Sequence, residues 1–132
     1  MRPTPRIDAH QHYWHYDPAG YAWLDDSMRA LRRDFTPEEA WREMRAAGFE
    51  RSIAVQVRQS LEETRWLLAQ ADTHAFIAGV VGWVDLRSPT LDAELDAVAP
   101  HPKLIGVRHI VQAEPDGFLS SPEFRRGVAR LD

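Results

Sequence analysis

Four short segments rich in β-branched residues alternate with four longer amphipathic segments, and this alternation constrains the fold more than any other feature. The strand-like segments are residues 6–9, 52–57, 76–84 and 104–109. Strands that alternate with helices at such spacings are typical of right-handed βαβ units on a parallel sheet. The second and third segments are nearly continuous apolar runs, as expected when both faces of a strand are covered. The predicted fold class is therefore α/β.

Capping residues mark where the intervening helices begin. Thr36 lies three residues before Glu39, with a proline between them at the first helical position, which is the pattern of a capping box. Ser60 and Glu63 repeat this spacing before the second helix. Two further helices are expected to begin near Ser88 and Ser120.

Four βα units fit two architectures. They can form a small open sheet, or they can form half of a (β/α)₈ barrel, which typically needs about 250 residues. The chain has 132 residues and 44% apolar composition, enough for one core and too little for two. We therefore expect residues 1–132 to belong to a single domain, and composition leaves both architectures open.

Composition excludes several function classes. The chain carries 16 basic and 20 acidic residues and no clustered basic stripe, so nucleic acid is not an expected partner. The longest apolar run, 76–84, contains two glycines and is far shorter than the roughly 20 residues of a membrane-spanning helix. The N-terminus lacks an apolar signal segment, and the chain has no cysteine, so a cytoplasmic location is expected. Any metal must be held by histidine and carboxylate ligands.

His10 and His12 stand at the end of the first predicted strand. Side chains at positions i and i+2 of a strand point to the same face, so the two imidazoles should converge. Neutral imidazole is a good ligand for zinc and related divalent ions, and two histidines make a partial site. The residues alone leave open the alternative that both are hydrogen-bonded groups at a strand end.

Residues 7–14, Ile-Asp-Ala-His-Gln-His-Tyr-Trp, resemble the first-strand motif of amidohydrolase-related barrels. The resemblance is to the branch that contains L-fuconolactone and L-rhamnonolactone hydrolases. It extends through residues 21–24, 55–57, 63–68, 82–86 and 106–109, and so covers essentially the whole chain. It implies a TIM-barrel fold of which the first four βα units are present.

The resemblance also implies roles for residues on one rim of the barrel. His10 and His12 match the positions that bind a divalent metal, for which zinc is the default and which some lactonase members do not need. Arg108 matches a basic residue at the end of the fourth strand that holds substrate, and a guanidinium suits carboxylate or carbonyl oxygens. An ordinary ion pair or aromatic packing is the alternative reading of these rim residues. The other predicted substrate-binding residues are His109, Gln56, Trp83 and Trp14.

Residues 13–35 form a connection longer than usual, which suggests a cover over the active site. Trp14, Tyr21 and Trp23 fall in this segment. They can contact substrate or can simply seal the mouth of the barrel. If Arg108 points into the barrel, alternation along the strand aims His109 toward the helix layer, unless the strand has already ended and the loop re-aims it.

The implied activity is the opening of a small-molecule sugar lactone by attack of water on its carbonyl carbon. The resemblance places further histidines on strands five and six and a general-base aspartate at the end of strand eight, beyond residue 132. Hydrolysis of a dicarboxylate lactone, or decarboxylation, is an alternative reaction. A non-catalytic half-barrel that binds metal or sugar acid is the alternative from another class, and open sheet edges favour a homodimer.

Overall fold

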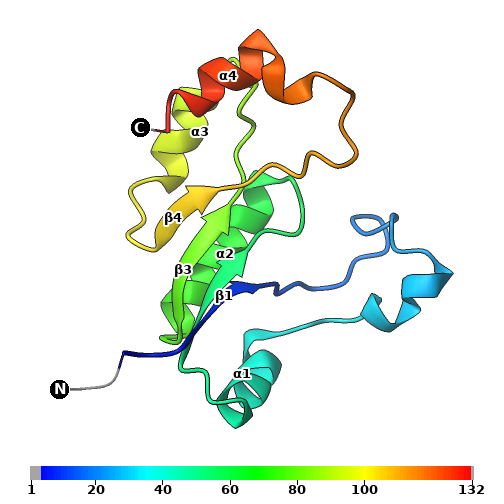
Figure 1. Cartoon of the computed structure of the whole chain (residues 1–132), viewed down its shortest axis with the longest axis vertical. Coiled ribbons are helices and arrows are strands. Elements are labelled where there is room, and N and C mark those ends of the chain that lie inside the picture. The colour runs from blue at the N-terminus through cyan, green and yellow to red at the C-terminus, as the bar shows by residue number, and fades with distance from the viewer. Residues whose placement is uncertain (1–3, 132) are drawn as a thin grey trace.

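The structure is a computed structural model, and it describes residues 4–131. Its strands form one sheet in the order β1-β2-β3-β4, and every neighbouring pair is parallel (Figure 1). The predicted α/β class is confirmed. In chain order the elements are β1 (Ile7–Gln11), the 3-10 helix η1 (Asp26–Leu31), α1 (Pro37–Ala46), β2 (Arg51–Val55), α2 (Leu61–Thr73), β3 (Ile77–Gly82), α3 (Leu91–Val98), β4 (Leu104–Val107), the 3-10 helix η2 (Phe118–Ser120) and α4 (Pro122–Val128).

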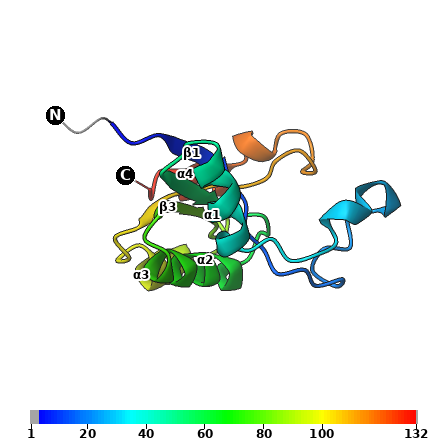
Figure 2. The same cartoon turned by 90° about the horizontal axis from the view of Figure 1, so that it is seen from below.

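The core lies between the sheet and the helices that cover one of its faces. Figure 2 shows α2 and α3 side by side along that face. Leu67 and Ala71 of α2 are fully buried, as are Ile77 and Val80 of β3. Their burial follows from the apolar stripe of α2 and from the apolar run of β3, which together exclude water from this layer.

The first two helices begin where the capping patterns predict. The Thr36 hydroxyl accepts the Glu39 N–H at 3.4 Å, and the Ser60 hydroxyl accepts the Glu63 N–H at 3.1 Å. Neither glutamate completes a reciprocal capping box. Glu39 pairs instead with Arg33, and Glu63 reaches back to the loop after β2.

The last two helices and all four strands differ in their bounds from the predictions. Helix α3 follows Thr90, because the Ser88 hydroxyl accepts the Thr90 N–H in a turn, and α4 follows Ser121. Strand β3 ends at Gly82, and β4 ends at Val107. Trp83, Arg108 and His109 therefore lie just beyond their strands, where backbone turns decide how their side chains point.

The long connection between β1 and α1 is closed at its base. Trp14 and Phe35 form an antiparallel bridge with two N–H to carbonyl bonds of 3.0 and 2.9 Å, and their rings pack with centroids 4.4 Å apart. Between them the chain, including η1, projects from the sheet in both views (Figures 1 and 2). The base of this excursion lies at the carboxyl end of β1, beside the histidine pair.

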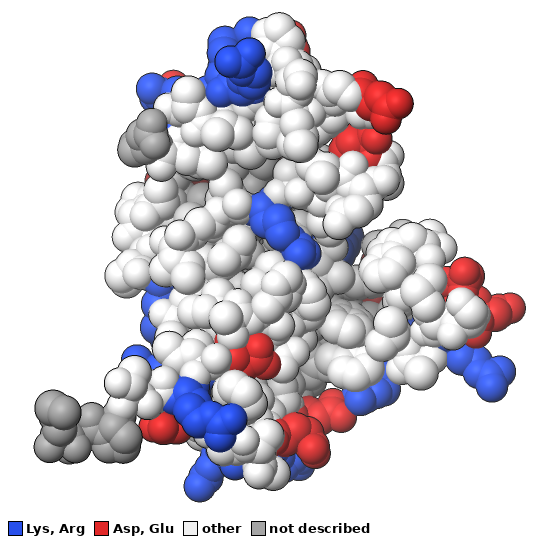
Figure 3. All heavy atoms as spheres, viewed as in Figure 1, with Lys and Arg blue, Asp and Glu red and all other residues white. Residues whose placement is uncertain are grey.

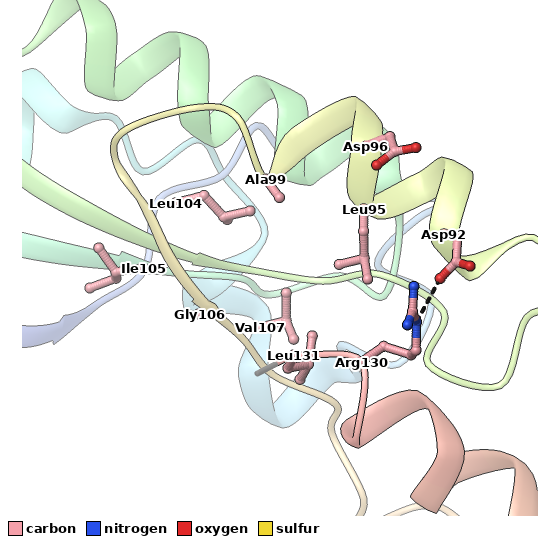
Figure 4. Close-up of a pocket in the computed structure, with 10 residues that line it drawn as sticks. All are labelled: Asp92, Leu95, Asp96, Ala99, Leu104, Ile105, Gly106, Val107, Arg130 and Leu131. Atoms are coloured by element: carbon pink, nitrogen blue, oxygen red, sulfur yellow. Dashed lines mark hydrogen bonds and ion pairs between the residues drawn. The ribbon is translucent and has the colours of Figure 1, made fainter.

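A hollow of about 430 Å³ opens beside β4. Leu95, Leu104, Val107 and Leu131 line it, and an ion pair of 2.8 Å between Arg130 and Asp92 lies at its rim (Figure 4). In the four-stranded sheet β1 and β4 have a neighbour on one side only. This hollow, whose lining also includes Asp92, Asp96 and Arg130, therefore belongs to an open edge of the sheet and is separate from the histidine pair.

Charge is dispersed over the surface in view. On the face drawn in Figure 3, basic and acidic side chains are interspersed and form no single broad patch of one sign. Among residues 4–131 no helix is both long enough and apolar enough to cross a membrane.

Helix α4 depends on the absence of a side chain at Gly127. A Cβ at this position would lie 1.8 Å from the Leu86 carbonyl oxygen, a backbone atom that cannot give way. We expect Gly127→Ala to displace α4 and to lower the free energy of unfolding by about 1–3 kcal/mol, as overpacking does. Urea unfolding checks this, with Gly106→Ala as the control because no atom lies within 4 Å of that position. Equal losses in both variants would contradict the packing account.

Candidate active site

His10 and His12 meet at the carboxyl end of β1. His10 lies in the strand and His12 directly follows it. Their Nε2 atoms are 3.2 Å apart, and the rings meet edge to face with centroids separated by 4.8 Å. Tyr13 is fully buried and its hydroxyl bonds to that of Ser52 at 2.8 Å, which anchors the strand end. The sequence prediction that the two imidazoles share a face agrees with this placement.

One hydrogen bond sets the tautomer of His12. Its Nδ1 lies 2.9 Å from the Val55 carbonyl oxygen, and because a carbonyl only accepts, Nδ1 carries the hydrogen. In the neutral ring the lone pair is therefore on Nε2, the atom that faces His10. Burial lowers the pKa of His12, and the nearby charges of His10 and Arg108 lower it further, against the opposing effect of the Val55 bond. His12 thus presents an uncharged nitrogen suited to coordination.

Arg108 is held beside this pair by Gln56. The guanidinium donates from Nε to the Gln56 side-chain oxygen at 2.8 Å and from Nη2 to the Gln56 backbone carbonyl at 2.7 Å. Gln56 is fully buried, so its orientation is fixed by packing. The remaining nitrogen, Nη1, lies 3.5 Å from Nε2 of His10. The carboxyl ends of β1, β2 and β4 thus bring together three of the predicted site residues around His10.

The spacing of the histidine nitrogens fits a metal ion. Two nitrogens bound to one tetrahedral zinc at 2.0–2.1 Å lie about 3.3 Å apart, close to the 3.2 Å between His10 and His12. The site offers fewer ligands than a catalytic zinc ion usually has. Among the described residues no group of three or more histidine or carboxylate side chains is placed to hold an ion. Residues 4–131 thus offer a two-nitrogen site, whereas catalytic zinc commonly takes three protein ligands.

His109 and Trp83 form a separate cluster. The Trp83 indole N–H donates to Nδ1 of His109 at 3.2 Å, so Nε2 of His109 carries a hydrogen, which it donates to Glu114 at 2.7 Å. The His109 ring also stacks on Phe118, with centroids 4.7 Å apart. Because β4 ends at Val107, His109 lies in the chain after the strand, where its bonds to Trp83 and Glu114 and its stacking on Phe118 set its direction. These contacts brace the chain after β4. A substrate role for His109 and Trp83 stays a prediction.

An apolar pocket of about 250 Å³ adjoins the histidine pair. The long first connection provides most of its wall, including Trp14, whose role in substrate binding stays a prediction. The buried indole N–H of Trp14 has no hydrogen-bond partner among the described residues. Sequence reasoning missed Leu24, Leu31 and Ile110, because no residue pattern indicates that they meet. The lining residues are His12, Trp14, Tyr21, Trp23, Leu24, Leu31, Val57, Arg108 and Ile110.

Glu63 is a buried carboxylate that sequence reasoning assigned only to a helix cap. Its oxygens accept the N–H groups of Val57 and Arg58 at 3.0 and 2.7 Å, and so fix the chain directly after Gln56. Burial raises the pKa of Glu63 to about 7, and the two backbone N–H groups offset only part of this rise. The side chain that fixes the loop beside Arg108 therefore titrates near neutral pH.

The raised pKa of Glu63 makes stability depend on pH. Because the native state holds this proton up to about pH 7, whereas the unfolded carboxyl loses it near its ordinary pKa of 4.5, the free energy of unfolding falls as pH rises between these values. This contribution amounts to about 3 kcal/mol. We expect Glu63→Gln to lose much less stability than the wild type between pH 5 and pH 8 in urea unfolding. Substitution of the exposed neighbouring residue, Glu62→Gln, is the control and should keep the wild-type dependence of stability on pH. A Glu63→Gln variant whose free energy of unfolding falls with pH as steeply as that of the wild type would refute the assignment.

Comparison with known sequences identifies relatives along almost the whole chain. The sequence pattern described as Amidohydrolase matches residues 7–132. A protein of Burkholderia multivorans named L-fucono-1,5-lactonase is 46% identical over 128 residues, which are 96% of this chain and 43% of the relative. A protein of Burkholderia ambifaria with the same name is 38% identical over 120 residues, 90% of this chain and 41% of the relative. The chain thus spans less than half the length of these curated relatives.

Solved structures agree with the sequence comparison. An amidohydrolase of Burkholderia multivorans with bound HEPES superposes with a TM-score of 0.91 at 43% identity, over 97% of this chain and 45% of that one. A zinc-bound crystal structure of an amidohydrolase from the same organism superposes with a TM-score of 0.90 at 45% identity, also over 97% of this chain and 45% of that one. Amidohydrolase 2 of Bifidobacterium longum subsp. infantis, at 24% identity and a TM-score of 0.64, supports the fold alone. The predicted partial TIM barrel is confirmed, and the chain belongs to the amidohydrolase family.

Proposed function

We propose that this chain carries the first part of a lactone-hydrolysing site and that its substrate is a sugar lactone such as L-fucono-1,5-lactone. The observation that carries the proposal is the convergence of three nitrogens at His10, whose Nε2 lies 3.2 Å from Nε2 of His12 and 3.5 Å from Nη1 of Arg108. Relatives named L-fucono-1,5-lactonase, at 46% and 38% identity, support the substrate class.

Arg108 provides the charge that ester hydrolysis requires. Attack of water on the lactone carbonyl places negative charge on the carbonyl oxygen, and a preorganised donor there stabilises the transition state. Gln56 occupies Nε and Nη2 of Arg108 and leaves Nη1 free to donate to that oxygen. Because Gln56 is fully buried, the guanidinium is oriented before substrate arrives.

The histidine pair is suited to a divalent ion. His10 and His12 would hold it through their Nε2 atoms, and the Val55 carbonyl keeps His12 in the required tautomer. A bound ion at such a position supplies Lewis acidity to a carbonyl and lowers the pKa of bound water. Zinc is the ion we propose, because it suits imidazole ligands and is bound in the Burkholderia multivorans relative.

The apolar pocket beside His12 and Arg108 suits the less polar part of a sugar lactone. Trp14, Tyr21 and Trp23 present aromatic surface there, and such faces pack against the C–H groups of a sugar ring. The long first connection thus fits the role of an active-site cover. The general base expected beyond residue 132 stays a prediction.

The direct test is lactone hydrolysis by the purified chain. We expect release of acid from L-fucono-1,5-lactone, followed with a pH indicator, and a loss of about 100-fold in the His10→Ala, His12→Ala double variant, the scale on which removal of one electrostatic stabiliser acts. The assay is run once with added zinc and once with a chelator.

The matched control is a His74→Ala, His101→Ala double variant. Both histidines bond to surface carboxylates, those of Glu38 and Asp72, and neither contacts the proposed site. This variant should retain wild-type turnover. A wild-type rate no greater than that of the His10→Ala, His12→Ala variant would contradict the expectation that the first part of the site hydrolyses the lactone without the residues expected beyond 132.

A further inference from the structure

The loop after β2, residues 56–60, supports the chain that follows β4, and we call it the β2 loop. Gln56 accepts Nε and Nη2 of Arg108 at 2.8 and 2.7 Å. Three residues further on, the Gln59 side-chain oxygen accepts the Ile110 N–H at 2.8 Å. Arg108 and Ile110 both line the apolar pocket. A shift of the β2 loop would therefore move two parts of that pocket together.

The β2 loop also contacts the first connection, through the side chain of Arg58. A Cβ placed on Gly20 would lie 2.7 Å from Cζ of Arg58, so the guanidinium lies directly against the Gly20 backbone. The same Cζ is 5.6 Å from the ring centroid of Tyr21, a buried residue. Tyr21 lines both the apolar pocket and a smaller cavity of about 180 Å³, which Arg58 and Glu63 also line. The β2 loop therefore supports the aromatic wall of the pocket as well.

Glu63, at the start of α2, holds the β2 loop from the helix layer. Its buried carboxylate accepts the N–H groups of Val57 and Arg58 at 3.0 and 2.7 Å. The Arg58 carbonyl in turn accepts the side-chain N–H of Gln56 at 3.3 Å. A chain of hydrogen bonds thus runs from Glu63 through Arg58 and Gln56 to Arg108. Because Glu63 lines the smaller cavity and not the apolar pocket, its influence on the pocket passes through these residues.

We propose that Glu63 is a positioning residue that, through the β2 loop, holds the Arg108 guanidinium and the aromatic wall of the apolar pocket as one unit. This role rests on the proposed function, which makes Arg108 and the pocket parts of the substrate site. Loss of the carboxylate removes the acceptor of two backbone N–H groups, which is costly at a partly buried loop. The loop then opens more often, and the residues that it supports are released in the same event.

The protonation state of Glu63 tunes this hold. Burial raises the pKa of Glu63 to about 7, and opening of the β2 loop would hydrate the carboxyl and return its pKa toward the ordinary 4.5. Because the closed loop keeps a proton that the open loop releases, opening costs less free energy as pH rises between these values. The charged or titratable side chains around Glu63 are Arg58 of the β2 loop, Arg108 after β4, Tyr21 and His15 of the first connection, and Glu62 of α2.

Hydrogen exchange followed by NMR on the 132-residue chain tests this role without substrate. The readouts are the Arg108 Nε–H and the Ile110 N–H, which bond to the β2 loop and not to Glu63. Each rate is divided by that of the buried Val80 N–H, which bonds to the Lys103 carbonyl in the sheet and serves as the reference for global unfolding. In Glu63→Leu we expect both ratios to rise at least about tenfold, because hydrogen bonds to a carboxylate are lost.

The matched control is Glu94→Leu. Glu94 of α3 accepts the Asp85 N–H at 3.0 Å, so it anchors the chain after β3 much as Glu63 anchors the β2 loop. Its loss should leave both exchange ratios within about threefold of wild type, because distant sites act independently.

Arg58→Met separates the aromatic wall from the chain after β4. It keeps the backbone N–H bonded to Glu63 and removes the guanidinium that lies near the Tyr21 ring. The Leu24 N–H, which bonds to the Tyr21 carbonyl at 3.0 Å, should exchange about threefold faster in this variant. The two hydrogens after β4 should keep their wild-type ratios, whereas Glu63→Leu should accelerate all three.

The dependence of exchange on pH separates positioning by the carboxylate from mere filling of space. Glu63→Gln keeps an oxygen for the two N–H groups and cannot titrate, so at pH 5 its exchange should lie within about fivefold of wild type. Between pH 5 and pH 7 the Arg108 and Ile110 hydrogens should accelerate roughly thirtyfold more in the wild type than in Glu63→Gln, because only the wild type releases a proton on opening. This comparison decides the matter if Glu63→Leu does not fold.

Equal exchange ratios in Glu63→Leu and Glu94→Leu, or parallel pH profiles of the wild type and Glu63→Gln, would overturn the positioning role. Acceleration of the Val80 N–H by the same factor as the other hydrogens would mean that Glu63 only stabilises the fold, and would overturn it too. Lactone turnover by a chain with equal ratios would overturn this role and leave the proposed function standing. Ratios that rise only in Glu63→Leu, in a chain without turnover, would support the role and count against hydrolysis by this part of the site.

Discussion

The bond between Gln56 and Arg108 organises the site. It joins the ends of β2 and β4, which are 52 residues apart in sequence, and it aims one guanidinium nitrogen at His10. A fully buried amide cannot rotate to another partner, so the cation is oriented by the core of the protein and not by solvent. Glu63 extends this arrangement, because its carboxylate fixes the two residues that follow Gln56.

The parallel sheet could be predicted because its signals are local. The second and third strand segments are nearly continuous apolar runs, and each of the first two helices begins at a hydroxyl that accepts the N–H three residues ahead. The paired histidines follow from the same periodicity, since residues two apart on a strand share a face. Arg108, beside His10, and His109, which bonds to Trp83 and Glu114, both lie beyond the end of β4, so alternation along the strand does not predict their directions.

Other features depend on contacts between distant residues, which no local pattern records. The Trp14–Phe35 bridge closes the long first connection through backbone bonds that any residue type can make. Leu31 of η1 lines the apolar pocket together with His12 and Arg108, residues that are far from it in sequence. The capping-box pattern placed Glu63 correctly in sequence, but its carboxylate bonds to Val57 and Arg58 because the β2 loop passes over the start of α2.

The central claim, that Gln56 holds Arg108 in place, is tested most directly by a double-mutant cycle of Gln56→Met and Arg108→Met on the free energy of unfolding. Side chains that share a hydrogen bond to a charged group are coupled, and the account predicts an interaction free energy of about 1–2 kcal/mol. If the losses in free energy of unfolding of the two single variants sum to that of the double variant to within about 0.3 kcal/mol, the two side chains act independently, which would contradict the account.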